Sequence, residues 1–396
     1  MPSPALSRVH IPEFDGLRGI AVLMVITFHF SSNLAFAPGA IRMFRPLLTP
    51  GWTGVDLFFI LSGCLITGIL LDEKATANYF SRFYTRRALR IFPVYYLALA
   101  VCLITMPAPA SIPGTTLAAY LLNASNWLSL SGAEIKYLSH YWSLAVEEQF
   151  YLVWPLAVFA LSKRAVLRVL LAVVVLAPVI RYALLVTIPD ADMALRVAGS
   201  ITPARADGLA FGALVAICLR NERLRSAILK RSGVALSITC AALVLWFGAR
   251  ERFHLESSVA RSLLSTLLGL SYGLLALRVA STSGAKTLLH GILRSKLLTA
   301  AGKYSYAAYV FHLLPIFWTI EQKLESLPDP ARRLLAVPCF LGSIGLVFLL
   351  ARLSWWLIEA PLLRLKARLA PPPPSSVNTL IQGDPLRGLA VMSELN

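Results

Sequence analysis

Apolar runs of about 20 residues recur along the chain, and they limit its fold more than any other feature. A helix rises about 1.5 Å per residue, so each run is long enough to cross the roughly 30 Å hydrocarbon core of a bilayer. The chain is 57% hydrophobic and only 14% charged, whereas a soluble domain is nearer a quarter charged. The sequence therefore predicts an all-α fold, a polytopic membrane helix bundle.

We expect about ten transmembrane helices, with a further moderately apolar stretch at 115–130 that predicts a re-entrant or interfacial helix. The predicted spans cover residues 16–36, 52–72, 88–106, 141–162, 166–187, 204–220, 232–250, 259–280, 303–321 and 333–357. Basic residues gather in the loops at 73–90, 162–168 and 220–231, which fall on one side of a ten-span bundle. By the positive-inside tendency, this side and both termini are cytoplasmic.

The domain organisation predicted from these runs is simple. Residues 1–369 are expected to form a single membrane domain. The proline-rich residues 370–396 are expected to form a flexible cytoplasmic tail. The net charge of +17 is explained by the basic loops, so it does not indicate a nucleic-acid partner. The five cysteines lie in apolar runs without CxxC spacing, which argues against a metal site or a disulfide framework.

The first span, FDGLRGIAVLMVITFHF, carries Arg18 and His29 although charged and titratable groups are costly in hydrocarbon. The step from Arg18 to His29 is eleven residues, close to three helical turns, so both side chains lie on one face roughly 16 Å apart along the helix. With Arg18 at the cytoplasmic edge, His29 lies beyond the midplane.

The same depth arithmetic predicts two layers of polar residues inside the membrane. Glu147 lies roughly 8 Å from the outer edge of its span and shares a helix face with Tyr151, so it is expected near His29. The outer layer is expected to hold His29, Asp56, Glu147, Asp207 and His312. The cytoplasmic layer is expected to hold Arg18, Arg86, Arg87 and Arg90.

Each of these residues also has a structural interpretation. The arginines of 86–90 could act only as topology signals, and Arg18 could extend its side chain to the interface. A buried histidine is often a hydrogen-bonded core residue, and Glu147 could link two helices. An intramembrane histidine, a glutamate and an arginine cluster together favour a functional site facing the bundle interior.

Seven motifs occur in an order that resembles acyltransferase family 3, the integral-membrane enzymes that O-acylate polysaccharides and other small molecules. They are FDGLRGIAVLMVITFHF, GVDLFFILSGCLITG, RRALRIFPVYY, YWSLAVEEQFYLVWP, RADGLAFG, YSYAAYVFH and WWLIEAP, within roughly residues 10 to 365. The resemblance implies ten or eleven spans, an acyl-CoA donor from the cytoplasm and an acceptor hydroxyl that is often outside. It also implies a stand-alone member without a fused esterase-like domain, in the bacterial cytoplasmic (inner) membrane.

By position, the family's paired arginine and histidine fall on Arg18 and His29, its RxxR motif on Arg87 and Arg90, and its Trp-Ser-Leu stretch with two glutamates on Trp142, Ser143, Glu147 and Glu148. The two layers then suggest roles for these and the other polar residues. His29 is the expected base and Glu147 its orienting or stabilising partner, as carboxylates are in hydrolase triads. The phosphates of acyl-CoA, expected to be acetyl-CoA, would bind to Arg18, Arg86, Arg87 and Arg90. The carbohydrate or glycolipid acceptor would contact Asp56, Trp142, Glu148, Tyr151, Arg205, Asp207 and His312. Direct transfer and an acyl-histidine intermediate both stay open.

Two other function classes fit the buried charges. A proton-coupled transporter or flippase could use His29, Glu147 and Asp207, although no internal repeat of the kind common in transporters is evident. In a membrane scaffold or sensor, the same charges would only hold helices together. Acetylated products favour the enzyme, and proton flux without ester formation favours the transporter.

Overall fold

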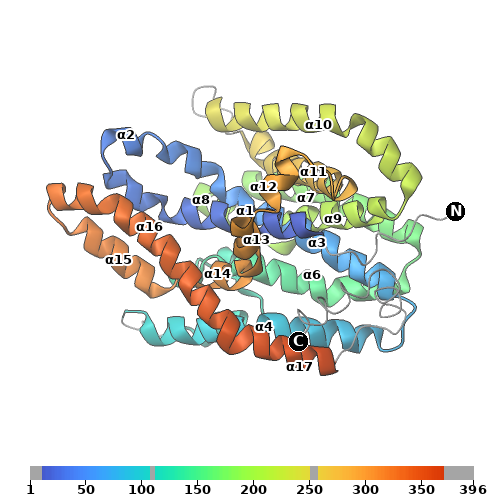
Figure 1. The fold of residues 1–396 in the computed structure, drawn as a ribbon, viewed down its shortest axis with the longest axis horizontal. Coiled ribbons are helices and arrows are strands. Elements are labelled where there is room, and N and C mark those ends of the chain that lie inside the picture. The colour runs from blue at the N-terminus through green and yellow to red at the C-terminus, as the bar shows by residue number, and fades with distance from the viewer. Residues whose placement is uncertain (1–10, 108–111, 250–256, 370–396) are drawn as a thin grey trace.

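The computed structural model describes residues 11–107, 112–249 and 257–369, in which every regular element is a helix (Figure 1). Eight candidate membrane spans are long and apolar enough to cross a bilayer, so the prediction of an all-α polytopic bundle is confirmed. They are Pro12–Phe36, Arg45–Glu73, Tyr79–Thr105, Lys163–Thr187, Ala191–Leu219, Glu222–Phe247, Ser258–Ser281 and Asp329–Leu365. The cytoplasmic placement of the termini stays a prediction, and the expected tail at 370–396 lies outside the described residues.

Nine helices longer than 15 residues form the bundle. They are α1 (Pro12–Phe30), α3 (Gly54–Glu73), α4 (Tyr79–Thr105), α6 (Tyr141–Ala160), α7 (Lys163–Thr187), α9 (Thr202–Leu219), α10 (Glu222–Ala249), α11 (Ser258–Ser281) and α16 (Asp329–Ser354), counted over the described residues. Shorter helical elements connect or extend them. These are η2 (Ser31–Phe36), α2 (Gly39–Arg42), η3 (Arg45–Thr53), α5 (Gly114–Leu121), η4 (Ser125–Leu130), η5 (Lys136–Leu138), α8 (Ala191–Ser200), α12 (Leu288–Leu293), α13 (Lys296–Lys303), α14 (Ser305–Phe311), α15 (Pro315–Glu325), η6 (Trp355–Glu359) and α17 (Ala360–Leu369).

Two of the ten predicted spans differ from the eight candidates. α6 is long enough, but Glu147, Glu148 and Gln149 lower its mean hydropathy, so it does not qualify on composition. The stretch predicted at 303–321 is not one helix, because α14 ends at Phe311 and α15 begins at Pro315. Proline disfavours the helical conformation of the residue before it, and Leu314 is accordingly non-helical (ψ 150°).

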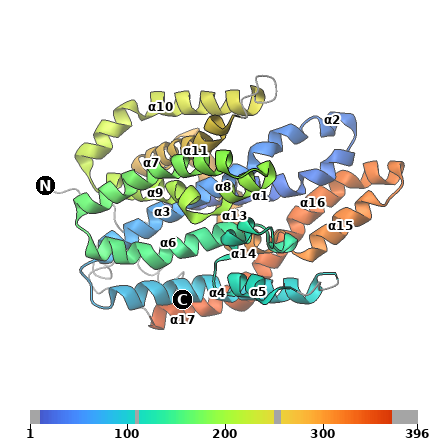
Figure 2. The same cartoon turned by 180° about the vertical axis from the view of Figure 1, so that it is seen from behind.

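α3 and α9 pack closely against each other in the bundle. Gly63 and Gly212 lie at their crossing, and a Cβ atom on either would come within 2.1 Å of a backbone carbonyl oxygen of the other helix. Small residues allow this approach in membrane proteins, where close van der Waals contact drives helix association. Both views place α10 at the periphery over α11 (Figures 1 and 2).

α6 lies between α4 and the α3–α9 pair (Figure 2), and it positions most of the polar residues described below. Tyr79 and Tyr84 of α4 donate hydrogen bonds to backbone carbonyl oxygens of α6, Tyr84 at 2.8 Å from the Leu152 oxygen. On the other side, Trp154 of α6 donates to Thr67 of α3 at 2.8 Å. These contacts hold α6 against both neighbours.

Candidate active site

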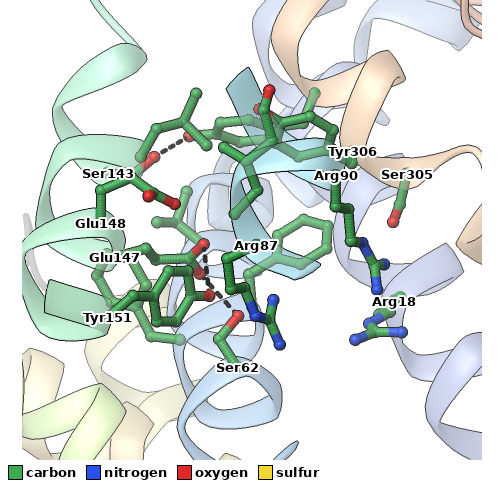
Figure 3. Close-up of a pocket in the computed structure, with 16 residues that line it drawn as sticks. Arg18, Ser62, Arg87, Arg90, Ser143, Glu147, Glu148, Tyr151, Ser305 and Tyr306 are labelled. Atoms are coloured by element: carbon green, nitrogen blue, oxygen red, sulfur yellow. Dashed lines mark hydrogen bonds between the residues drawn. The ribbon is translucent and has the colours of Figure 1, made fainter. Parts of the chain in front are cut away.

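A narrow cavity of about 80 Å³ lies between α1, α3, α4, α6 and α14 (Figure 3). We call it the arginine cavity. Its polar lining consists of Arg18, Ser62, Arg87, Arg90, Ser143, Glu147, Glu148, Tyr151, Ser305, Tyr306 and Tyr309. Its apolar lining consists of Val55, Phe58, Phe59, Ile91 and Leu144. The fold thus gathers residues from five helices that are far apart in the sequence.

Arginines from two helices line one end of this cavity. Arg87 and Arg90 lie three residues apart on α4, and Arg18 reaches toward them from α1 (Figure 3). The Arg87 guanidinium stacks on Tyr151, 5.0 Å from the centre of its ring. Among the ion pairs of the described residues, none uses Arg87 or Arg90. Guanidinium groups without a carboxylate partner are well suited to bind an anion from outside the chain.

Arg86 does not reach the cavity, which corrects the expected group of four arginines. Its guanidinium lies 3.0 Å from a carboxylate oxygen of Glu73. Around the helix Arg86 lies about 100° from Arg87, with Arg90 between them, so the ion pair with Glu73 rather than the helix face keeps Arg86 out of the cavity lining. The sequence places the three arginines together, but only Arg87 and Arg90 line the cavity.

Glu147 lies on the α6 side of the arginine cavity. The Ser62 hydroxyl donates to one of its carboxylate oxygens at 2.9 Å, and the Tyr151 hydroxyl donates to the other at 3.2 Å. Because Ser62 belongs to α3, this carboxylate links two helices. It also holds Tyr151, whose ring contacts Arg87.

The expected contact between Glu147 and His29 is not present among the hydrogen bonds and ion pairs of the described residues. His140, the residue before α6, lies at the level of His29, because the rings of both residues pack against His312. Glu147 follows seven residues later, about 10 Å farther along the helix toward Arg18. The depth estimate placed the membrane edge at the start of α6 and therefore put Glu147 in the wrong layer.

Two hydroxyl groups mark the opposite end of the arginine cavity. The Ser143 hydroxyl of α6 and the Tyr309 hydroxyl of α14 lie 2.5 Å apart. Both side chains are buried, and both hydroxyls also approach the His140 carbonyl oxygen, Ser143 at 3.0 Å. The ring of Tyr309 contacts His312 and His140, with centroid distances of 5.3 and 5.5 Å. A histidine cluster therefore lies directly behind this end of the cavity.

The histidine cluster consists of His29, His140 and His312. The ring centroids lie 4.8 Å apart for His29 and His312 and 4.6 Å apart for His140 and His312. Nδ1 of His29 lies 2.9 Å from the Val25 carbonyl oxygen, which can only accept a hydrogen bond. Nδ1 must therefore carry the proton, and the neutral ring keeps a free lone pair on Nε2. This is the tautomer that a general base needs.

The two other histidines follow the same rule. Nε2 of His140 contacts the Val310 carbonyl oxygen at 3.1 Å, and Nδ1 of His312 contacts the Tyr309 carbonyl oxygen. Their second ring nitrogens are buried without a hydrogen-bond partner. His140 was not among the predicted site residues. The available signal was its position immediately before the YWSLAVEEQ motif in a chain with six histidines.

Three of the predicted acceptor residues instead belong to a buried ionic network. Arg205 pairs with Asp56 at 2.8 Å and also donates to Ser265. Asp207 pairs with Arg181 at 2.8 Å. Arg181, which the sequence interpretation missed, also donates to the Ser262 and Ala204 carbonyl oxygens and to Thr266. An arginine inside the apolar run of α7 was the signal for it.

The remaining candidates lie in three places. Glu148 and Tyr151 line the arginine cavity, and His312 belongs to the histidine cluster. Trp142 faces a second, larger cavity, and its ring packs against Phe59 and the Arg205 guanidinium. The structure therefore separates the predicted residues into an arginine group, a histidine group and an ionic network.

Comparison with known proteins gives a consistent set of similarities. A family model for an acyltransferase domain matches residues 11–352. The peptidoglycan O-acetyltransferase OatA of Listeria monocytogenes is 29% identical over 382 residues, covering 90% of this chain and 56% of the relative. The putative peptidoglycan O-acetyltransferase YrhL of Bacillus subtilis is 32% identical over 236 residues, 55% of this chain and 34% of the relative. The O-acetyltransferase OatA of Staphylococcus aureus is 27% identical over 375 residues, 89% of this chain and 57% of the relative.

The chain thus spans little more than half the length of the two OatA proteins it matches. No solved structure has significant similarity to this chain. The residues matched by the family model include the arginine cavity and the histidine cluster.

Proposed function

Because the chain belongs to the acyltransferase domain family, we propose that it is a membrane O-acyltransferase that moves an acetyl group from acetyl-CoA to a carbohydrate hydroxyl. The observation that carries this proposal is the arginine cavity. It has anion-binding guanidinium groups at one end and buried hydroxyl groups at the other. The histidine cluster lies next to those hydroxyls.

Acetyl-CoA supplies an activated acetyl thioester at the end of a long pantetheine arm, with phosphates at the other end of the molecule. Arg18, Arg87 and Arg90 would bind these phosphates through charge-assisted hydrogen bonds. The pantetheine arm would extend from the arginines toward Ser143 and Tyr309, which line the same cavity. Arg18 and His29 are about 16 Å apart along α1, a distance that such an arm can cover.

His29 would act as the general base. Nε2 of His29 takes the proton from the acceptor hydroxyl while the hydroxyl oxygen bonds to the thioester carbonyl carbon. The carbon–sulfur bond breaks, and the leaving sulfur receives the proton from the imidazolium. The hydroxyls of Ser143 and Tyr309 lie where they could donate to the carbonyl oxygen as negative charge develops on it.

Glu147 would be a positioning residue rather than the partner of His29. It accepts hydrogen bonds from Ser62 and Tyr151, and the Tyr151 ring lies under the Arg87 guanidinium. Glu147 would therefore keep Arg87 oriented toward the donor phosphates. The acceptor class rests on the relatives, two of which are named as peptidoglycan O-acetyltransferases.

The direct test uses the full chain in lipid nanodiscs with acetyl-CoA that carries a carbon-13 acetyl group. Soluble glycan fragments of peptidoglycan serve as acceptors, and mass spectrometry detects labelled esters. We expect labelled ester on the glycan and one free CoA for each ester. Absence of both labelled ester and free CoA would reject acetyl-CoA as the donor. Proton flux in proteoliposomes without any ester formation would favour the transporter interpretation over the enzyme.

A further inference from the structure

A positively charged aromatic surface lies beside the arginine end of the arginine cavity. Lys303 ends α13 and Tyr304 follows it, while Trp355 begins η6. The Lys303 ammonium lies 4.5 Å from the centre of the Trp355 ring, and the rings of Tyr304 and Trp355 pack edge-to-face with centroids 6.0 Å apart. We call these three residues the lysine–tryptophan platform. None of them has a role in the proposed transfer.

Contacts on two sides place the platform next to the arginines. α13 packs tightly on α1, since a Cβ atom on Gly302 would overlap the Asp15 carbonyl oxygen. The Asp15 carboxylate accepts a hydrogen bond from Arg18 at 3.5 Å. Ser305, the residue after the platform's tyrosine, lines the cavity on the side of Arg18 and Arg90 (Figure 3). The platform therefore lies within a few residues of the cavity lining.

The third platform residue belongs to an irregular turn of a long helix. η6 is a π-helical turn between α16 and α17, and it packs against α4. Such single π-helical turns are frequent at functional sites. Glu359, at the end of η6, is buried and lies close enough to Arg90 to be attracted by its charge. The same turn thus brings Trp355 to Lys303 and Glu359 toward the arginine cavity.

Lys303 carries a charge that no carboxylate of the described residues compensates. Its side chain is exposed and takes part in none of their ion pairs. Arg294, just before α13, is by contrast paired with the buried Glu13. A lysine ammonium without a carboxylate partner is available to bind a phosphate group as a point charge.

Tryptophan, tyrosine and lysine also gather at membrane interfaces, where they serve as anchors in the lipid headgroup region. The neighbouring Trp356 fits that role, because 61% of its surface is exposed. Trp355 is instead half-buried, and its ring packs on Tyr304 and under the Lys303 ammonium. Anchoring in lipid does not explain why these three side chains converge beside the arginine cavity.

The nucleotide end of coenzyme A has the chemistry that this platform would recognise. Beyond its two bridging phosphates, coenzyme A ends in an adenosine that carries a 3′-phosphate. With the pantetheine arm in the arginine cavity and the bridging phosphates at Arg87 and Arg90, this end would emerge beside the platform. Aromatic side chains stack on nucleobases, and a lysine ammonium pairs with a phosphate.

We propose that the lysine–tryptophan platform binds the 3′-phosphoadenosine end of the donor, with the adenine against the Trp355 indole and the 3′-phosphate at Lys303. The inference rests on the proposed use of acetyl-CoA, but the binding can be measured without any transfer. The platform would let the protein distinguish acetyl-CoA from shorter thioesters that carry the same pantetheine arm.

The test measures the Kd of three ligands by calorimetry on the full chain in phosphatidylcholine nanodiscs. CoA carries the whole nucleotide, 3′-dephospho-CoA lacks only the 3′-phosphate, and 4′-phosphopantetheine lacks the nucleotide. We expect CoA to bind about tenfold more tightly than 3′-dephospho-CoA, as for one charge-assisted hydrogen bond. We expect 3′-dephospho-CoA to bind at least about tenfold more tightly than 4′-phosphopantetheine, as for one stacked base.

Variants of the platform separate its two parts. Lys303→Gln should remove the preference for CoA over 3′-dephospho-CoA, and Lys303→Arg should keep it. Trp355→Leu should weaken CoA and 3′-dephospho-CoA about tenfold and leave 4′-phosphopantetheine unchanged, which also shows that the variant is folded. The matched controls are Lys323→Gln on α15 and Trp356→Leu, which remove an exposed lysine and an exposed tryptophan outside the platform. They should change none of the three affinities.

Equal affinities of the wild type for CoA and 3′-dephospho-CoA would overturn the inference. So would an equal loss for all three ligands in Trp355→Leu, because that residue would then only support the fold. Acetyl transfer with an unchanged kcat/KM for acetyl-CoA in both Lys303→Gln and Trp355→Leu would reject this inference alone. The expected pattern of affinities without any ester formation would support the inference and reject the proposed transfer.

Discussion

The imidazole rings of His29 and His312 lie edge-to-face, with their centroids 4.8 Å apart. His29 is the penultimate residue of α1, and His312 lies at the break between α14 and α15. The break leaves backbone without helical hydrogen bonds, which is tolerated inside a membrane protein where the segment is buried in protein. The side chain of His312 is fully buried, so the broken helix and the first span together hold the histidine cluster in place.

Removing the Tyr309 hydroxyl should slow acetyl transfer without weakening CoA binding. Tyr309→Phe eliminates the 2.5 Å contact with Ser143 at the end of the cavity away from the arginines. We expect kcat to fall by about a hundredfold, as when one oxyanion donor is lost, with the Kd for CoA unchanged. Tyr96→Phe is the control, since that hydroxyl bonds to the Leu121 carbonyl oxygen at an exposed site. An unchanged kcat in Tyr309→Phe would show that this hydroxyl does not contribute to catalysis.

Neutralising Arg87 or Arg90 should weaken donor binding, whereas neutralising Arg86 should not. Arg87→Gln and Arg90→Gln each remove a guanidinium from the arginine cavity, so we expect the Kd for CoA to rise by about tenfold or more. Arg86→Gln is a matched control because its guanidinium pairs with Glu73 outside the cavity. Calorimetry at two salt concentrations measures both the affinity and its electrostatic part. A larger loss in Arg86→Gln than in its neighbours would contradict the placement of the donor.

Breaking the buried pair of Arg181 and Asp207 should destabilise the bundle. Arg181→Met leaves the Asp207 carboxylate buried without its 2.8 Å partner, which costs on the order of 3–5 kcal/mol. The double variant Arg181→Met with Asp207→Leu removes both charges and should recover part of the loss. Thermal unfolding in detergent compares the two variants with the wild type. Equal melting temperatures for all three would show that the pair contributes nothing to stability.

The crossing of α3 and α9 should not tolerate a methyl group. A Cβ on Gly212 would lie 2.1 Å from the Ile60 carbonyl oxygen, so Gly212→Ala must push the helices apart, at a cost of about 1–3 kcal/mol. Gly345→Ala is the control on α16, where a Cβ meets no atom within 4 Å. Alanine has the higher helix propensity, so this control should be neutral or slightly stabilising. Matching losses of stability in both variants would refute the close approach.

The sequence predicts the helical membrane fold well because apolar runs report span length directly. Arg18, Arg87 and Arg90 were also placed correctly near each other, since helix positions near one membrane edge gather at one level. The predicted depth of Glu147 in the membrane was wrong, because a helix need not begin at the membrane edge. Its true level is visible only through the contacts of His140 with His312.

Other features depended on contacts between distant segments. Pro315 signals a helix break, but an apolar stretch on both sides hides it in a hydropathy pattern. The ion pair of Arg181 and Asp207 joins α7 to α9, and the sequence around either residue does not predict which residue it pairs with. The second, larger cavity, which Trp142 faces, combines residues from η3, α6, α7, α8, α9, α10 and α11, so no local motif could predict it.

The central claim is that His29 accepts the proton of the acceptor hydroxyl while acetyl-CoA is held by the arginine cavity. The most direct measurement is single-turnover acetyl transfer by His29→Gln in nanodiscs, with the Kd for CoA determined on the same sample. Glutamine keeps a polar side chain of similar length but cannot accept a proton. The account predicts that transfer falls by at least a hundredfold while the Kd for CoA stays within twofold of wild type. Transfer at the wild-type rate in this variant would contradict the account.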